Sequence, residues 1–511
     1  MEKFAKVIFI GILFLAFLFR FYNFQNLFFF GMDQEYEALI VKNIVDFKHF
    51  PLIGVNASDT GLYLGPAFIY LAAVPFYIFR GNPLGWGLTA SFLGVFTVYF
   101  IYKVGKKMFS KKVGFFASLL YSSSFLTSFY DRQFWNPTPI PLFSLLIGFL
   151  LYRILNNNRK SLLLLALSFG IAIQAHLSIL IFLPLIIYVV MKRFNKLGVK
   201  TVLLSIIIFI LLQTPIILFE LRHNFLNTKA FINLVAKKSE QTSTSSFSER
   251  NSLFLSTLGR FFWVPYKPDL FLESGQCKEL SSLRKNAYPE GIIMVMVGLI
   301  IFLRRYFSKN KFATSSKLIL SICLLTFLFV LFYNRSIFEY YFLFFFPWLA
   351  IALGRSLDLI WGRKQGKVIV LPVIILFVVL NLMTLFSAYS SYSYPDKLEA
   401  MRFVNNYVME KDYTLEALGN CPRFGGYRYL FEYFVGVPKH SYMDTYFEWL
   451  YPDVSAKKNP NRTVLLSLID FRDKAEDIKR WEEEKFNFLA ENRIVAKEKF
   501  GRIQVFILDK R

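Results

Sequence analysis

The chain has 511 residues, of which 55% are hydrophobic and 19% aromatic, whereas only 18% are charged. Soluble globular proteins carry about a quarter charged residues, so this composition excludes an ordinary soluble domain. The formal net charge of +24 does not indicate nucleic-acid binding, because the Lys and Arg residues gather in short loops between apolar segments. We therefore expect a polytopic integral membrane protein with no nucleic-acid partner.

Apolar segments recur along the chain at about the 20-residue length that a helix needs to cross a bilayer. The basic loops between them are expected on the cytoplasmic side; they comprise residues 103–112, 159–160, 192–200, 304–317 and 363–367. Alternating the chain around these loops predicts about eleven transmembrane helices, near residues 4–22, 86–104, 113–129, 138–155, 161–175, 177–191, 200–219, 289–307, 317–333, 337–353 and 367–386.

One apolar segment, Gly65–Phe79, does not span the membrane in this predicted topology. If it spanned the membrane, the lysines of residues 103–112 would lie outside, against the positive-inside rule. The segment is short and opens with Gly-Pro, so we expect a juxtamembrane or re-entrant helix within a first outer loop of residues 23–85. The basic start of the chain lacks a small-residue cleavage site, which predicts a retained first helix.

The predicted transmembrane domain, residues 1–386, includes a long outer loop over residues 220–289. The sequence pattern changes after residue 386, and residues 387–511 are predicted to form a small extracytoplasmic α/β domain. Its expected elements are a helix over residues 397–408, a buried strand over 463–470, an amphipathic helix over 473–492 and a hairpin over 493–510 that turns near Gly501.

Three carboxylates, Asp33, Glu35 and Glu37, follow the first apolar segment within five residues of one another. On a helix that starts near Gly31, Asp33 and Glu37 share one face and Glu35 points elsewhere. Acidic residues in a first turn also complement the helix dipole, so a purely structural role is the alternative to a functional site.

A second acidic residue favours a functional site over a purely structural role. Asp131 lies at another predicted outer helix end, in the segment "YDRQFWNP". Carboxylates at the outer ends of two packed membrane helices could form one polar site. The alternative is a surface ion pair between Asp131 and Arg132, which would carry little energy.

The order of these segments resembles a known family. "GMDQ" after the first helix is followed by "GLYLGPAFIYLAAVPFYIF", a basic loop, "YDRQFWNPTPIPLFSLL" and "GIAIQAHLSILIFLP". This order is similar to the integral-membrane glycosyltransferases of the GT-C class. The likeness is to the dolichyl-phosphate-mannose protein mannosyltransferases (glycosyltransferase family 39) and their bacterial relatives, which include aminoarabinose transferases. It covers residues 4–225 and, more weakly, residues 339–354.

The resemblance implies an enzyme that moves a hexosyl or pentosyl group from a polyprenyl-phosphate-linked donor to an extracytoplasmic acceptor, which is a protein, a lipid or a glycan. It further implies a plasma or inner membrane location with the active site facing outward. The family's catalytic base matches Asp33, and its second outer acid matches Asp131. Where many relatives carry Arg or His, this chain has Glu339, which departs from the family's phosphate contact.

The chemistry of such a reaction selects further residues. A carboxylate removes the proton of the acceptor hydroxyl, and cations at the outer face neutralise the leaving phosphate. A single displacement with the base opposite the leaving group predicts inversion at the anomeric carbon. The candidate substrate-binding residues are Glu37, Tyr130, Arg132, Asn136, His176, Arg260 and Arg335, with Lys267 as a further outer cation.

Several of these residues have simpler interpretations. His176 lies at an outer turn, where a capping or interhelical hydrogen bond is an alternative to substrate binding. Glu220 and His223 are three residues apart and could both reach a divalent metal, although such pairs are frequent by chance. No cofactor is firmly required by the sequence, and a divalent metal remains an option. Cys277 and Cys421 are expected outside the membrane and could pair.

A transporter or lipid flippase is the alternative function. Transporters commonly contain inverted repeats and charges near the bilayer midplane. The sequence contains no evident internal repeat, and its acids lie at predicted helix ends. A non-catalytic assembly scaffold would leave the carboxylates dispensable. The sequence therefore favours an enzyme whose partners are membrane lipid, a polyprenyl-phosphate-linked sugar and an outer acceptor.

Overall fold

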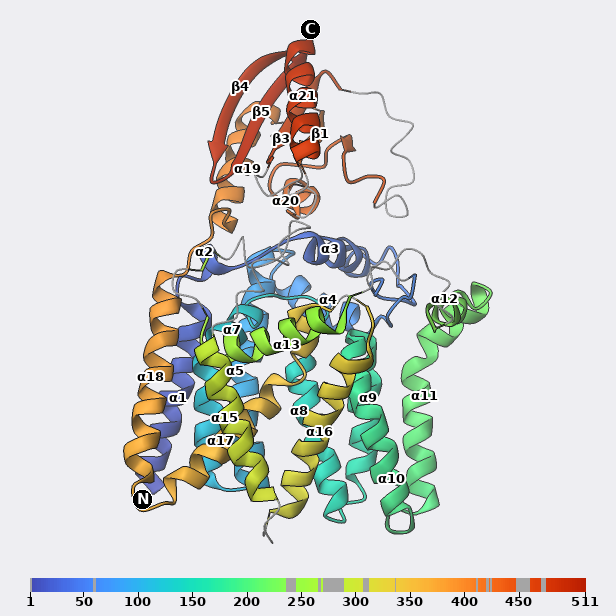
Figure 1. Ribbon diagram of the computed structural model, residues 1–511. Helices are drawn as coiled ribbons and strands as arrows, with labels where there is room; N and C mark the ends of the chain where they lie inside the picture. Colours follow the sequence, from blue (N-terminus) through green and yellow to red (C-terminus); the bar gives the residue numbers. More distant parts are fainter. Residues whose placement is uncertain are drawn as a thin grey trace.

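The computed structural model describes residues 2–511 apart from 58–60, 236–244, 265–267, 270–288, 307–311, 336, 410–411, 420–421, 423–424, 447–459 and 470–474. The described residues form a bundle of long helices with a small sheet unit at one end (Figure 1). The N-terminus lies at the opposite end of the bundle, together with the turns that join α10 to α11 and α17 to α18.

The bundle is built from apolar helices that run along a common direction (Figure 1). They are α1 (Glu2–Phe21), α5 (Pro83–Met108), α6 (Lys111–Ser123), α7 (Phe125–Tyr130), α8 (Ile140–Leu155), α9 (Ser161–Ala175), η2 (Leu177–Phe182) with α10 (Leu183–Leu197), α11 (Val199–Arg222), α15 (Pro289–Tyr306), α16 (Ala313–Phe332), η4 (Glu339–Phe342) with α17 (Phe346–Trp361), and α18 (Gly366–Ser387).

Each predicted membrane segment coincides with one of these helices or helix pairs. Among the described residues, five helical stretches are long and apolar enough to cross a bilayer: Pro83–Met108, Leu177–Leu197, Val199–Arg222, Ala313–Phe332 and Gly366–Ser387. Shorter apolar helices accompany them. The polytopic helical fold is therefore confirmed. The number of eleven transmembrane helices is still a prediction.

Two helices of the segment predicted as the first outer loop lie at the sheet end of the bundle. α3 (Met32–Val45) runs crosswise between the bundle and the sheet unit (Figure 1), after the single turn of α2 (Phe24–Leu27). α4 (Ala67–Ile78) packs on α3. With 12 residues, α4 is shorter than the roughly 20 residues of a transmembrane helix, as expected for a juxtamembrane segment.

The long outer loop contains more helix than the sequence analysis predicted. α12 (Leu226–Val235) follows α11, and α13 (Phe247–Phe262) lies crosswise at the sheet end of the bundle (Figure 1). α13 begins with a capping box, in which Ser246 and Glu249 exchange side-chain and backbone hydrogen bonds. Such a pair stabilises a helix start, and the polar sequence around it obscured the helix.

The sheet unit has five strands in the order β2-β1-β3-β5-β4. β1 pairs in parallel with β2 and β3, while β5 pairs antiparallel with β3 and β4. The strands are β1 (Tyr413–Leu418), β2 (His440–Ser441), β3 (Arg462–Ser467), β4 (Asn492–Phe500) and β5 (Ile503–Lys510), and the helices are α19 (Tyr394–Val408), α20 (Tyr427–Phe434) and α21 (Ala475–Glu491).

The predicted elements of this unit are confirmed. β3 is a continuous apolar run because both of its faces are covered: Leu465 packs with Phe488 and Leu489 of α21, while Leu466 joins the main core. The hairpin turns at Gly501, whose φ of +51° favours glycine. β1 and the two-residue β2 were not predicted, because they are short and carry polar residues.

We predict that the two ends of the bundle face opposite sides of the membrane. Lys112, exposed at the start of α6, and Lys48, 66% exposed just after α3, lie at these two ends. In a background lacking the three native cysteines, Lys48→Cys is expected to react with an impermeant maleimide added outside intact cells. Lys112→Cys is expected to react only after permeabilisation. Labelling of both from outside would contradict the predicted topology.

Candidate active site

Helix α3 carries acidic side chains on two opposite faces. Its residues advance by 100° each, so Asp33 and Glu37 lie on one face, and Glu35 lies about 200° away from Asp33. The helix starts at Gly31, whose N–H donates to Gln34 Oε1 at 3.0 Å. The two faces contact different bodies, the helical bundle and the sheet unit.

Glu37 connects α3 to the bundle. It is fully buried, and its Oε1 accepts the backbone N–H of Asn136 at 3.0 Å. The Asn136 side chain in turn donates to the carbonyl of Ala175 at 2.8 Å. Burial and, secondarily, the charge of Asp33 raise the pKa of Glu37 well above its ordinary value, against the Asn136 hydrogen bond that lowers it. Burial therefore favours the neutral form of Glu37.

Asp33 lies one turn before Glu37 and differs from it in accessibility. Its side chain is exposed, yet the surrounding protein desolvates the carboxyl and raises its pKa to about 6. Within the described ranges we find no hydrogen bond or ion pair to this carboxylate. An accessible carboxylate whose pKa lies near neutrality has the properties of a general base.

The segments singled out in the sequence converge around this region. The Trp135 ring lies 4.7 Å from the ring of Tyr340 between centroids, and the His176 ring meets the edge of Tyr340 at 5.7 Å and of Tyr341 at 5.5 Å. The structure thus brings the "FWNP" turn, the start of η2 and η4 together, although they are far apart in the sequence.

Tyr130 and Arg260 meet at Glu339. The Tyr130 hydroxyl donates to Glu339 Oε1 at 2.9 Å, and Arg260 Nε lies 3.1 Å from Glu339 Oε2. This second contact is an ion pair without hydrogen-bond alignment, since neither atom has a hydrogen-bond partner. All three side chains are at least nine-tenths buried. Glu339 therefore neutralises Arg260 in this structure.

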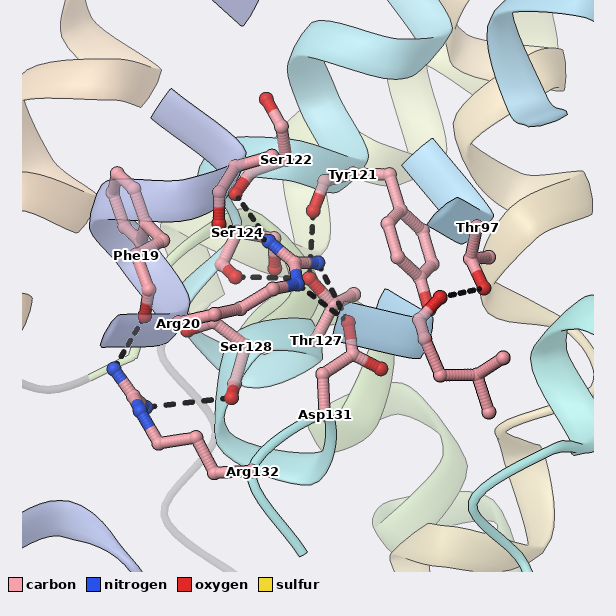
Figure 2. A network of polar contacts seen from close by, with 12 residues as sticks. Phe19, Arg20, Thr97, Tyr121, Ser122, Ser124, Thr127, Ser128, Asp131 and Arg132 are labelled. Carbon is pink, nitrogen blue, oxygen red and sulfur yellow. Dashed lines mark hydrogen bonds and ion pairs between the residues drawn. The ribbon is translucent and has the colours of Figure 1, made fainter. Parts of the chain in front are cut away.

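Asp131 is paired with an arginine that the sequence analysis did not single out. Figure 2 shows Arg20 reaching from α1 toward Asp131, with Nε and Nη2 donating to Oδ2 at 2.9 and 2.6 Å. Arg20 also donates to the Ser122 carbonyl at 3.1 Å. The surface ion pair considered between Asp131 and Arg132 is therefore replaced by a buried one, which locks α1 to the turn after α7.

Arg132 points away from Asp131 (Figure 2). It is fully buried, and it donates to the carbonyl of Phe19 and, at 3.3 Å, to that of Ser128. These contacts fasten α7 to α1. They do not favour the phosphate-binding role expected for Arg132, because its outer nitrogen atoms are directed at backbone oxygens.

Other candidate residues also have structural partners. His176 Nδ1 accepts the N–H of Ser178 at 3.2 Å and so caps η2, which is the simpler interpretation considered for it. Glu220 accepts the N–H groups of Asn227 and Thr228 at 2.8 and 2.9 Å. Arg335 is half-buried, and its carbonyl accepts a hydrogen bond from Ser245 at 2.6 Å.

A metal role for Glu220 and His223 finds no support in these contacts. Both oxygens of Glu220 cap α12, and His223 stacks on Phe219 at 4.2 Å. In the part of the chain that the structure describes, no three His, Cys, Asp or Glu side chains gather to hold a metal. Lys267, Cys277 and Cys421, and with them the proposed cysteine pair, lie outside the described residues.

Arg20 and Glu35 are the residues that sequence reasoning missed. Arg20 could have been identified from the sequence, because an arginine within an apolar helix requires a buried partner. Glu35 has no such signal. It was recognised only as lying off the Asp33 face, and its partner is found 394 residues away.

We predict that Gly94→Ala destabilises the protein by separating Arg20 from Asp131. A Cβ at position 94 would lie 2.5 Å from Asp131 Oδ2 and 2.6 Å from Arg20 Nε, and overpacking of this kind costs about 1–3 kcal/mol. The melting temperature in detergent is expected to fall by several degrees. Gly11→Ala is the matched control, because a Cβ at position 11 has no neighbour within 4 Å. Equal melting temperatures for the two variants would contradict the prediction.

Comparison with known proteins gives matches in sequence and in fold. Residues 64–219 match the family model of dolichyl-phosphate-mannose-protein mannosyltransferases. The chain shares its fold with ArnT from Cupriavidus metallidurans, solved bound to undecaprenyl phosphate, with a TM-score of 0.63 and 11% identity over 99% of this chain and 98% of ArnT. No curated protein sequence matches significantly.

The archaeal oligosaccharyltransferase AglB from Archaeoglobus fulgidus is a second, more distant neighbour. Its structure with an inhibitory peptide and a dolichol-phosphate gives a TM-score of 0.53 and 12% identity over 99% of this chain and 74% of AglB. The sequence match over residues 64–219 and the shared fold agree with the likeness that the sequence indicated.

Proposed function

We propose that this protein transfers a sugar from a polyprenyl-phosphate-linked donor to the hydroxyl of a protein, lipid or glycan acceptor, with Asp33 as the general base. The observation that carries the proposal is the environment of Asp33: an exposed carboxylate with a pKa near 6 on a helix braced against the bundle. The family match over residues 64–219 and the lipid phosphates bound to ArnT and AglB support the donor class.

The charge distribution supports an extracytoplasmic position for this site. The turns that carry residues 192–200 and 363–367 lie at the N-terminal end of the bundle, opposite α3 (Figure 1). Basic loops mark the cytoplasmic side in membrane proteins. By this rule α3 and the sheet unit face outward, where the lipid-linked donor would present its sugar.

The chemistry is a single displacement. The Asp33 carboxylate takes the proton of the acceptor hydroxyl as its oxygen bonds to the anomeric carbon. The bond from that carbon to the phosphate oxygen breaks, its electron pair stays on the phosphate, and polyprenyl phosphate leaves. Because attack and departure occur on opposite faces, the anomeric centre inverts, as in inverting glycosidases.

Neighbouring residues serve this displacement in different ways. Glu37 fixes the Asn136 turn, and burial favours its neutral form. Its carboxyl is coupled to that of Asp33, and groups coupled in this way titrate together. Arg335 is the cation that we assign to the leaving phosphate, because Glu339 neutralises Arg260, and Tyr130, Asn136 and His176 line the same region. Asp131 acts through its ion pair with Arg20, which fixes the turn before Asn136.

We predict that Asp33→Asn lowers turnover by about 10²–10⁴-fold, because it removes the basic lone pair while keeping size and polarity. Donor binding is expected to survive. In the native protein kcat/KM should rise with pH through about 6, since the base must lose its proton to act and its pKa is raised to about 6. This limb of the profile should be absent in Asp33→Asn. Turnover is measured as release of polyprenyl phosphate.

Asp46→Asn is the matched control for this substitution. Asp46 ends the same helix and pairs with Lys48 at 2.9 Å on the surface, a contact of small energy. It is expected to turn over at the native rate. Native turnover by Asp33→Asn, with Asp46→Asn unchanged, would remove Asp33 from the mechanism.

The function itself is tested with purified protein and a panel of polyprenyl-phosphate-linked sugars, both hexoses and pentoses. A glycosyltransferase releases polyprenyl phosphate from one member of the panel in the presence of an acceptor. The alternative, a lipid flippase, would move the same donors across a vesicle membrane without cleaving them. Translocation without release for every sugar would overturn the proposal.

A further inference from the structure

The sheet unit holds one face of α3 through a set of polar contacts. Glu35 Oε1 accepts the backbone N–H of Tyr429 in α20 at 2.8 Å. Lys397 of α19 reaches the carbonyl of Phe30, just before α3. At the other end of the helix, Lys42 forms an ion pair with Glu432. These contacts lie on the side of α3 opposite Asp33.

Glu35 is buried without exposure to solvent, and only one of its oxygens has a partner, since Oε2 is unsatisfied. Burial raises its pKa to about 7, while the Tyr429 N–H and the charges of Arg428 and Lys397 lower it. A buried carboxyl with an unsatisfied oxygen is costly. Its hydrogen bond to Tyr429 fixes α3 against α20.

Lys397 fixes the start of the helix from the other side. Its ammonium donates to Phe30 O at 2.8 Å and to Gly425 O at 2.6 Å, and it lies 5.0 Å from the ring centroid of Tyr392. The side chain is only 2% exposed. Gly426 packs so closely that a Cβ there would lie 2.7 Å from the Phe30 ring, so this contact has no space for a larger residue.

Tyr429 links the same point to the rest of the first outer loop. Besides its N–H contact with Glu35, its hydroxyl donates to Gly81 O at 2.6 Å. Gly81 has a φ of +76°, and a Cβ there would lie 2.7 Å from the Tyr429 hydroxyl. The sheet unit thereby fixes both α3 and the segment before α5 through one residue.

Building on the function proposed above, we propose that the sheet unit is a positioning element of the active site, in which Glu35 and Lys397 hold the first turn of α3 so that Asp33 meets the acceptor hydroxyl. The contacts at Phe30 and Glu35 bracket Asp33 in the sequence. Displacement of a catalytic group by about 1 Å can cost 10²-fold in rate, and none of these contacts involves a residue that we assign to the donor.

The test compares two Lys→Met substitutions on the same interface. Lys397→Met removes the donors at the start of α3, and Lys42→Met removes a pair with Glu432 near the end of the helix, where Lys42 is 36% exposed. We expect Lys397→Met to lower kcat at least tenfold with the donor KM changed less than twofold. Lys42→Met should retain native kcat. Equal losses in both would overturn the proposal, because domain docking in general would then explain them.

The second part of the test uses substitutions of Glu35. Glu35→Ala removes the acceptor for the Tyr429 N–H and should lower kcat at least tenfold while moving the kcat/KM limb near pH 6, because the surroundings of Asp33 change. Glu35→Gln keeps an acceptor oxygen and should restore most of the activity. If Glu35→Ala fails to fold, Glu35→Asp, which retracts the carboxylate, takes its place with the same expected direction. A reduced melting temperature with native kcat and native pH profile would show a structural role only and overturn the proposal.

Asp33→Asn, assayed in parallel, separates this inference from the proposed function. Loss of turnover in Asp33→Asn together with native kinetics in Glu35→Ala and Lys397→Met would overturn the positioning role alone. Native turnover in Asp33→Asn would instead overturn the assignment of the base on which the positioning role depends.

Discussion

Helix α3 is held between two bodies by buried carboxylates on its opposite faces. Glu37 accepts an N–H of the bundle, from Asn136, and Glu35 accepts an N–H of the sheet unit, from Tyr429. The helix alone can satisfy neither group, because they point to nearly opposite sides. Its orientation is therefore fixed only when both bodies are in place, and the accessible carboxylate of Asp33 is fixed with it.

Other charged side chains in the bundle beneath α3 are paired with one another. Arg20 with Asp131 and Arg260 with Glu339 form ion pairs that are almost fully shielded from solvent. Removing one member of such a pair leaves an uncompensated buried charge, at a cost of about 3–5 kcal/mol. Each pair joins segments that are distant in the sequence, so these charges define the geometry of the bundle end while Asp33 stays open to solvent.

The ion pairs and the buried carboxylates fix this end of the bundle, whereas the Asp33 carboxylate is exposed. Desolvation raises the pKa of Asp33 to about 6, close enough to neutrality for proton transfer, and burial favours the neutral form of Glu37 beside it. The proposed transfer would take place at this end of the bundle, where α3 lies between the helices and the sheet unit (Figure 1).

The sequence by itself determined the membrane segments, the shared face of Asp33 and Glu37, and the hairpin at Gly501, because hydropathy, helical periodicity and turn chemistry are local properties. The partners of the charges were decided only by tertiary structure. Arg20 meets Asp131 across 111 residues, Tyr130 meets Glu339 across 209, and Glu35 meets Tyr429 across 394. Local pattern carries no information about which distant group will share a buried site, since that depends on how whole helices pack.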